Sequence, residues 1–267
     1  MKKTKLGIVG LSIIGASIYD ALKDSLDYEL YIHSNSSFDK VKDFVKSASS
    51  DIEVVKNCDI VFVCTKLSQT LKTLTTLNSF LNKNTLVVDV SSSKKELINK
   101  TFNFSFILSH PMAGSEKTGF EAKDKELFKG ARWLVEKKEE TLFKIIKDLG
   151  AIPLIIDMKD HDSLCAQISH LPTLLSFLLF DCASKEARQI ASSGFRDTTR
   201  LAMTNSDLII SMLNTNEDNI LSALSRMLEK LNYLKNLSDS EKINLFEQIA
   251  HQRKAMYDKN GKNIFKI

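Results

Sequence analysis

The segment "GIVGLSIIGAS", residues 7 to 17, decides the fold of the first part of the chain. An apolar run ends at Gly10, which permits a tight turn between a strand and a helix. Gly15 lets that helix pack closely on the strand, and Ser12 stands where the dinucleotide-binding fingerprint G-x-G-x-x-G has its middle glycine. Serine is small enough for phosphates to fit with a slight displacement. We expect the phosphate-binding residues to be Gly10, Ser12, Ile14 and Gly15. A plain strand, turn and helix without a nucleotide is the alternative.

Short apolar runs alternate with helix-length amphipathic segments in the first part of the chain. The runs are "KLGIVG", "YELYIH", "CDIVFVC", "TLVVDV", "FSFILSH", "ARWLVE" and "IPLIID". Strands that are apolar on both faces are typical of a parallel sheet covered by helices. After Asp157 no such run occurs, and residues 160 to 258 follow the pattern of long amphipathic helices. The sequence predicts an α/β fold, with a Rossmann-type, mostly parallel sheet domain over residues 1–157 and an all-helical domain over residues 158–267.

The predicted helical domain is apolar on more than one face, as in "LPTLLSFLLF" and "LIISMLNT". We expect it to mediate a homodimer, and a core buried within one chain is the alternative explanation. The stretch "LPTLLSFLLF" is about half the length that spans a bilayer, so no transmembrane helix is expected.

The composition bears on partners and location. The 267 residues include 37 Lys and Arg and 33 Asp and Glu, and the net charge of +4 is spread along the chain rather than gathered in a basic block. Binding to nucleic acid is therefore not expected. The four cysteines form no C-x-x-C pair, which favours reduced thiols and a cytoplasmic location, and no metal site is expected. The first apolar run merges into a glycine turn rather than a signal-peptide cleavage site.

The residues after the second apolar run bear on the choice of cofactor. An acidic residue there would bind the ribose 2′-hydroxyl of NAD, yet "YIHSNSS" is followed by no carboxylate before Asp39. His33, Ser34 and Asn35 can donate hydrogen bonds to a 2′-phosphate. We therefore expect NADP, or use of both cofactors. Ordinary polar turn residues, with NAD bound less tightly, are the alternative.

Three further segments carry a family resemblance. They are "VDVSSSK" at residues 88–94, "HPMAGSEKTG" at residues 110–119 and "SSGFRDTTRLA" at residues 192–202, the last preceded by "SHLP" at residues 169–172. Together with the glycine loop, and in this order, they resemble the prephenate and arogenate dehydrogenase family of tyrosine biosynthesis. The resemblance implies an oxidative decarboxylation, in which a cyclohexadienol gives hydride to a nicotinamide, loses carbon dioxide and becomes aromatic.

His110 is the candidate proton acceptor for such a reaction. A hydroxyl that becomes a carbonyl must lose its proton, and a neutral imidazole is suited to accept it. The histidine follows the run "FSFILS", which places it at the carboxyl end of a strand, where open α/β sheets bind their ligands. The alternative is a histidine that only caps a strand end.

Ser92 belongs to an Asp-x-x-Ser-x-Lys pattern formed with Asp89 and Lys94. The resemblance implies that Ser92 hydrogen-bonds the reacting hydroxyl and the nicotinamide side. Its neighbours Ser91 and Ser93 make the assignment uncertain by one position. The alternative role is an N-cap for the helix expected at "KKELINK".

Arg196 and Arg200 are the candidate ligands for the substrate carboxylates. Their i,i+4 spacing predicts a shared helix face, where two like charges repel unless an anion lies between them. The alternative is an ion pair between Asp197 and Arg200 on a solvated face. The resemblance assigns carboxylate binding to Arg200 and a supporting role to Arg196.

The resemblance also implies substrate contacts elsewhere. Ser115 and Glu116 continue the histidine loop and would shape the pocket entrance, although Glu116 could instead pair with a nearby lysine. His170 lies in "SHLP", which resembles a family "SHLPH". Thr173 replaces the second histidine of that pattern, which puts in doubt any role that depends on it.

The resemblance thus implies a prephenate dehydrogenase using NAD or NADP. Arogenate dehydrogenase is the first alternative, because the two substrates differ only in a side-chain keto or amino group. Another small hydroxyacid or imine-reducing dehydrogenase would usually carry a catalytic lysine or acid on the helical domain, and no such lysine stands out. A non-catalytic nucleotide sensor would not need His110, Ser92 and two arginines together.

Overall fold

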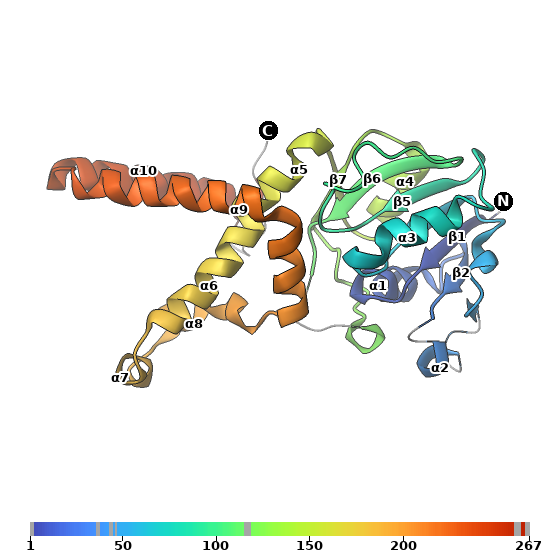
Figure 1. The fold of residues 1–267 in the computed structure, drawn as a ribbon, viewed down its shortest axis with the longest axis horizontal. Helices are drawn as coiled ribbons and strands as arrows, with labels where there is room; N and C mark the ends of the chain where they lie inside the picture. The colour runs from blue at the N-terminus through green and yellow to red at the C-terminus, as the bar shows by residue number, and fades with distance from the viewer. Residues whose placement is uncertain are drawn as a thin grey trace. The chain divides into compact units, whose positions relative to one another are not determined.

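The structure is a computed structural model that describes residues 3–35, 38–42, 45, 47–114, 119–258 and 263–264 (Figure 1). The chain forms two compact units, Met1–Glu217 and Asp218–Ile267. Each is described below by itself.

One sheet organises the first unit and runs from blue to green in Figure 1. Within the described residues it has eight strands in the order β3-β2-β1-β4-β5-β6-β7-β8. All neighbouring pairs are parallel except β6 and β7, which are antiparallel. The strands are β1 Thr4–Val9, β2 Tyr28–His33, β3 Ala48–Ser49, β4 Ile60–Val63, β5 Leu86–Asp89, β6 Ser105–Pro111, β7 Arg132–Val135 and β8 Ile152–Ile155.

Helices connect the strands, and after β8 the described elements are helical as far as Met256. The helices between strands are α1 Ile13–Leu22, α2 Phe38–Val41, α3 Leu67–Leu77 and α4 Glu140–Asp148, with the 3-10 turns η1 Ile52–Val55 and η2 Phe120–Ala122. After β8 come α5 Met158–Cys165, the π-helical turn η3 Ala166–His170, α6 Leu171–Cys182, α7 Lys185–Gln189, α8 Ser193–Thr198, the 3-10 turn η4 Arg200–Met203, α9 Ser206–Lys235 and α10 Asp239–Met256.

The apolar runs form strands that contribute side chains to the core of the first unit. Every residue of β4 is buried, as a strand covered on both faces requires. All seven runs contain a strand, and the predicted fold class is confirmed. Among the strands of the described residues, β3 was the one not predicted, because it has two residues and no apolar run of its own.

The secondary structure changes from strand to helix at the predicted domain boundary. The last strand ends at Ile155, and α5 begins at Met158 with Asp157 as its N-cap, whose side chain accepts a hydrogen bond from the Lys159 N–H. The compact units divide elsewhere, between Glu217 and Asp218. The boundary between residues 157 and 158 therefore stays a prediction about domains.

The helical run Met158–Cys182 is long and apolar enough to cross a membrane, judged by length and composition alone. The prediction of no transmembrane helix rests on the apolar second half of this run alone. Inside this run Asp162 hydrogen-bonds to the loop after β5, so the run is attached to the sheet at its start. Apolar helices that pack in the core of a protein pass the same test of length and composition.

Candidate active site

The turn after β1 has the shape of a phosphate-binding loop. Gly10 has a φ of +97°, and a Cβ there would lie 2.8 Å from the carbonyl oxygen of Cys64. A Cβ on Gly15 would lie 2.1 Å from the carbonyl oxygen of Gly10, so the helix can approach the strand only because that position is glycine. Ser12 is the N-cap of α1, and its hydroxyl makes no cap hydrogen bond. This hydroxyl and the N–H groups of the first turn of α1, with Ile14, are available to an anion.

The three residues at the end of β2 that were expected to bind the ribose 2′-phosphate of the cofactor differ in their exposure to solvent. His33 and Ser34 are buried, whereas Asn35 is exposed. Burial lowers the pKa of His33, and the carboxylate of Asp51 acts in the opposite direction. The fold therefore brings a carboxylate near this strand end that the local sequence did not indicate.

A buried lysine braces the carboxyl ends of β5 and β6. The Lys94 ammonium donates hydrogen bonds to the Asp89 carboxylate and to the carbonyl oxygens of Ser91 and Ser109, the latter two at 2.7 Å. Both ionic side chains are almost fully buried, so each charge has its partner inside the protein. Ser109 immediately precedes His110, and the lysine thus holds the backbone from which the imidazole projects.

The loop after β5 carries three serines in different settings. The Ser91 hydroxyl donates to the carbonyl oxygen of Ser93, and the Ser93 hydroxyl donates to Asp162 at 2.9 Å. Both serines are buried. Ser92 is half-buried, and its hydroxyl has no hydrogen-bond partner in the described part of the chain. Ser92 is therefore the serine whose hydroxyl remains available to a ligand.

The Asp162 carboxylate on α5 joins that loop to a histidine. It accepts hydrogen bonds from the backbone N–H groups of Lys94 and Lys95 at 2.9 Å and from Nδ1 of His161 at 2.7 Å. Burial acts to raise the pKa of Asp162, but the bonds from His161, Lys94 and Ser93 outweigh it and lower this pKa to about 2. The carboxylate is ionised at neutral pH.

His110 is the end of a chain of hydrogen bonds that starts at this carboxylate. Its Nδ1 lies 2.9 Å from Nε2 of His161. Burial holds the pKa of His110 well below its ordinary value, and the charge of Lys94 acts in the same direction. At neutral pH the His110 imidazole is therefore uncharged, as a proton acceptor must be.

The hydrogen bonds assign the tautomers of both rings. In a neutral His161 ring the proton lies on Nδ1, because the Asp162 carboxylate only accepts, and Nε2 is then an acceptor. His110 must then donate from Nδ1 to His161, which leaves the lone pair of His110 on Nε2. That lone pair is available to a substrate hydroxyl.

Cys165 lies beside the two histidines, one helical turn after His161. Its Sγ is 3.5 Å from Nε2 of His161 and 3.9 Å from Nδ1 of His110. Burial raises the pKa of this thiol to about 12, so it is protonated at neutral pH. Cys58 and Cys64 are also buried, whereas Cys182 is exposed, and all four thiols are free.

His170 ends a π-helical turn, where the N–H of Leu171 reaches the carbonyl oxygen of Ala166. Its Nδ1 is 3.0 Å from Nδ2 of Asn216, which also donates to the carbonyl oxygen of Asp162 at 2.7 Å. Asn216 sits at a kink in α9, with φ −136° and ψ 24°. His170 is thereby fixed next to the His161 and Asp162 segment.

Thr173, which stands where the family pattern has a second histidine, bonds within its own helical run. It is buried, and its hydroxyl donates to the carbonyl oxygen of Ser169 at 2.9 Å. The side chain is thus bound within its own helix.

The two arginines do not share a helix face, so that prediction is wrong. Helix α8 ends at Thr198, Thr199 has non-helical dihedral angles, and Arg200 begins the 3-10 turn η4. The expected alternative, an Asp197 to Arg200 ion pair, is also not what forms: Asp197 accepts from Nε of Arg196 at 2.8 Å. Arg200 is exposed, with no hydrogen bond to its guanidinium among the described residues.

The structure brings some of the predicted residues together and leaves others apart. His110 and His170 are linked by hydrogen bonds to the His161 and Asp162 pair, His170 through Asn216, and Ser92 precedes the Ser93 that bonds Asp162. Neither arginine hydrogen-bonds to His110 in the described part of the chain. Ser115 and Glu116 lie outside the described residues. His161 and Asp162 are functional candidates that were not predicted from the sequence. The sequence could have pointed to these two residues only through the adjacent His-Asp pair at the start of the first long helix. Their partner His110 lies 51 residues away from His161, so no local spacing indicates the contact.

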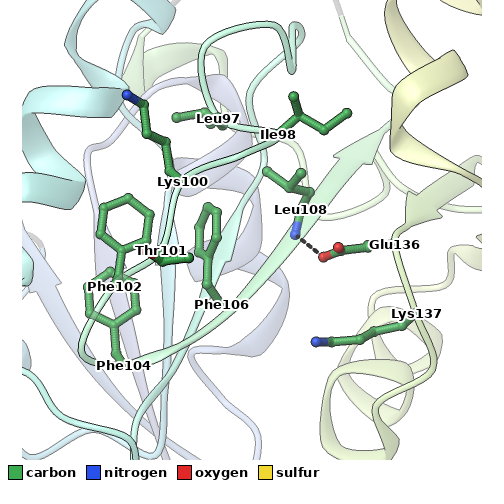
Figure 2. Close-up of a pocket in the computed structure, with 10 residues that line it drawn as sticks. All are labelled: Leu97, Ile98, Lys100, Thr101, Phe102, Phe104, Phe106, Leu108, Glu136 and Lys137. Carbon is green, nitrogen blue, oxygen red and sulfur yellow. Dashed lines mark hydrogen bonds between the residues drawn. The ribbon is translucent and has the colours of Figure 1, made fainter.

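A cavity of about 230 Å³ lies apart from these groups, beside the first half of β6. Figure 2 shows Phe102, Phe104 and Phe106 grouped on one side and Glu136 accepting from the Leu108 N–H at 3.4 Å. The lining residues are Leu97, Ile98, Lys100, Thr101, Phe102, Phe104, Phe106, Leu108, Glu136 and Lys137. None of these described side chains hydrogen-bonds to His110 or Asp162, so the cavity is separate from the site.

Comparison with known proteins identifies the family. The family model described as the nucleotide-binding domain of prephenate dehydrogenase matches residues 29–152, and the model described as its dimerization domain matches residues 157–252. A prephenate dehydrogenase of Lactococcus lactis subsp. cremoris is 31% identical, over 94% of this chain and 77% of the relative. The chain belongs to the prephenate dehydrogenase family. The resemblance predicted from the motifs is confirmed, and the chain is an oxidoreductase of this family with a nucleotide-binding and a dimerization domain.

Solved structures agree with the family and its fold. The arogenate dehydrogenase of Synechocystis is 28% identical, with a TM-score of 0.76 over 94% of this chain and 98% of that one. Prephenate dehydrogenase of Aquifex aeolicus, solved with hydroxyphenyl propionate and NAD+, has a TM-score of 0.82 over 95% of this chain and 98% of that one. At 21% identity, this second structure supports the fold alone.

Proposed function

We propose that the chain oxidises and decarboxylates prephenate to 4-hydroxyphenylpyruvate and carbon dioxide, with hydride transfer to a nicotinamide dinucleotide. The observation that carries this proposal is the uncharged His110, held at the carboxyl end of β6 with its Nε2 lone pair available. Such a group can accept the proton of a ring hydroxyl.

The proposed reaction uses Nε2 of His110 twice, first to accept a proton and then to return it. Nε2 accepts the hydroxyl proton as the carbinol carbon gives its hydride to the nicotinamide. The carbon–carboxylate bond then breaks, its electron pair enters the ring, and the ring carbonyl oxygen becomes a phenolate. His110 returns the proton to that oxygen. The transient charge on the imidazole is stabilised through His161 by the Asp162 carboxylate.

Other residues would bind and orient the substrate. The free hydroxyl of Ser92 is suited to hydrogen-bond the reacting hydroxyl, and the exposed Arg200 is suited to a substrate carboxylate. Arg196 would support that site together with its partner Asp197. Ser115, Glu116 and His170 remain proposed substrate contacts on the strength of the sequence motifs.

The glycine loop would hold the cofactor pyrophosphate, and Gly10, Ser12, Ile14 and Gly15 fit that task. We propose that both NAD+ and NADP+ are accepted, because no carboxylate follows β2 before Asp39 and Asn35 is exposed. The nearby Asp51 favours NAD+, as does the NAD+ bound in the Aquifex aeolicus relative. The ratio of kcat/KM for the two cofactors measures this balance.

Arogenate is the second candidate substrate, because the Synechocystis relative is an arogenate dehydrogenase. We further propose that the chain acts as a homodimer, since its second part matches a dimerization domain, and that it acts in the cytoplasm.

The deciding experiment follows reduced nicotinamide by absorbance with prephenate or arogenate and with NAD+ or NADP+. We expect reduction with prephenate, and no reduction with any of the four pairs would overturn the proposal. The variant His110→Asn should keep its affinity for cofactor and lose about 10²- to 10⁴-fold in kcat. Unchanged turnover would remove His110 as the proton acceptor.

A further inference from the structure

We propose that His110, His161 and Cys165 form a binding site for Zn²⁺ or a similar borderline-soft divalent cation, and that occupation of this site switches the enzyme off. All three ligand atoms lie within 4.8 Å of one another. His161 and Cys165 are buried and His110 is half-buried, so the site would be largely shielded from water. The mechanism proposed above makes no use of Cys165.

The spacing of the three atoms suits a tetrahedral ion. Zinc bonds of usual length at tetrahedral angles put two nitrogens about 3.3 Å apart and a nitrogen and a sulfur about 3.6 Å apart. The observed separations are 2.9 Å between the two nitrogens, 3.5 Å from Sγ to His161 and 3.9 Å from Sγ to His110. Each differs from the ideal value by less than about 0.5 Å. Water or a substrate oxygen would complete the coordination.

The residues that hydrogen-bond to the three ligands are arranged as in known zinc sites. A histidine that binds zinc through one nitrogen usually donates from the other to a carboxylate, which fixes the ring and raises its basicity. His161 already donates from Nδ1 to Asp162, which leaves Nε2 free of a proton. Asp162 is itself held by the backbone N–H groups of Lys94 and Lys95.

The charges within the cluster balance when an ion is bound. Two positive charges on zinc are offset by a Cys165 thiolate and the Asp162 carboxylate, and the charge of Lys94 is already paired with Asp89. A neutral cluster is what a buried site requires. Coordination by a cation is what would remove the proton of the Cys165 thiol.

Inhibition follows from the tautomer of His110. Binding takes the proton from the Cys165 thiol and releases it to solvent. His110 must offer the Nδ1 lone pair to the ion, so the proton on that nitrogen moves to Nε2. The substrate hydroxyl then faces an N–H group in place of a lone pair and cannot give up its proton. The metal and the substrate proton thus compete for the same imidazole.

The test uses the full-length protein with Co²⁺ as a spectroscopic probe for the zinc site. We expect one Co²⁺ per chain and a thiolate-to-cobalt charge-transfer band. The variant Cys165→Ser should lose the band and bind at least tenfold more weakly. Cys165→Ala provides the same test should the serine variant fold poorly, and Cys182→Ser, at the exposed cysteine, should behave like the wild type. The absence of a thiolate band, or a band unchanged by loss of Cys165, would overturn the site.

A second measurement tests the switch. Zn²⁺ should abolish turnover of the wild type, a chelator should restore it, and Cys165→Ser should need at least tenfold more Zn²⁺ for half-inhibition. Equal inhibition of both proteins contradicts the switch. This part rests on the proposed function, whereas the cobalt spectrum requires no catalysis, so failure of one is distinguishable from failure of the other.

Discussion

His110 is uncharged at neutral pH because of the groups that surround it. Burial and the charge of Lys94 both lower its pKa, while the Asp162 carboxylate raises it by a smaller amount. The imidazole therefore stays uncharged into mildly acidic solution, and its pKa differs from that of a histidine in water.

Acidification should reveal this difference. The acid limb of the kcat/KM profile should lie below pH 6.5, the ordinary value for histidine. The unfolded chain takes up the proton near pH 6.5 and the folded chain only at lower pH, so the free energy of unfolding should fall as the pH drops below 6.5. Initial rates and thermal unfolding across this range check both statements. An acid limb of the kcat/KM profile above pH 6.5 would show that burial does not determine the pKa of His110.

Asp162 should control the tautomer of His110. In Asp162→Asn the new amide can donate to Nδ1 of His161, which puts the His161 proton on Nε2 and the His110 proton on its own Nε2. We expect kcat to fall by about 10²-fold or more. The acid limb should also move to lower pH, because the charge that raised the pKa of His110 is gone.

The matched control is Asp160→Asn, which removes an exposed carboxylate from the same helix. It should leave kcat and the acid limb unchanged. Equal losses in the two variants would mean that the effect on His110 arises from net charge alone.

At the scale of elements, the close packing of α1 on β1 depends on one glycine. In Gly15→Ala the new methyl group would lie 2.1 Å from the carbonyl oxygen of Gly10, and backbone cannot yield as a side chain can. We expect a loss of about 3 kcal/mol in the free energy of unfolding and much weaker cofactor binding. Denaturant titration and cofactor titration measure the two effects.

Gly194 in α8 provides the control, because a Cβ at that position meets nothing within 4 Å. Gly194→Ala should leave stability and cofactor binding nearly unchanged. A stable Gly15→Ala that binds cofactor normally would contradict the role given to this packing.

The sequence predicted the strands and the places of His110 and Ser92 at or just after strand ends, and it did so for a physical reason. Apolar runs such as residues 60–63 are buried on both faces, so the residue types of the run itself are enough to predict its burial. The contact between His110 and His161 depends on how α5 docks, and no local pattern specifies that. The arginine prediction was wrong because spacing alone does not reveal the break at Thr199.

At the scale of the whole molecule, apolar side chains remain exposed on the helices of the second unit. Leu228 and Leu231 of α9 and Phe246 of α10 each expose about half of their surface. A water-soluble chain rarely leaves so many large apolar groups uncovered along a helix. A second copy of the chain would cover them, as the matched dimerization domain implies.

Sedimentation should therefore find a dimer, and Leu231→Glu should shift it toward the monomer, because a buried carboxylate without a partner opposes association. The control is Leu26→Glu, at an exposed leucine of the sheet unit, which should remain dimeric. A monomeric wild type, or equal effects of both substitutions, would place the interface elsewhere.

The Asp162 carboxylate has a consequence for how activity returns after denaturation. It joins helix α5 to the loop that carries Ser92 and also sets the proton position on His110. The sheet could regain its strands and bind nucleotide before α5 docks, but turnover could not begin until this one carboxylate reaches its donors. In a refolding experiment, the time at which turnover first appears would therefore report when α5 docks. Circular dichroism, which follows secondary structure, would not detect this step.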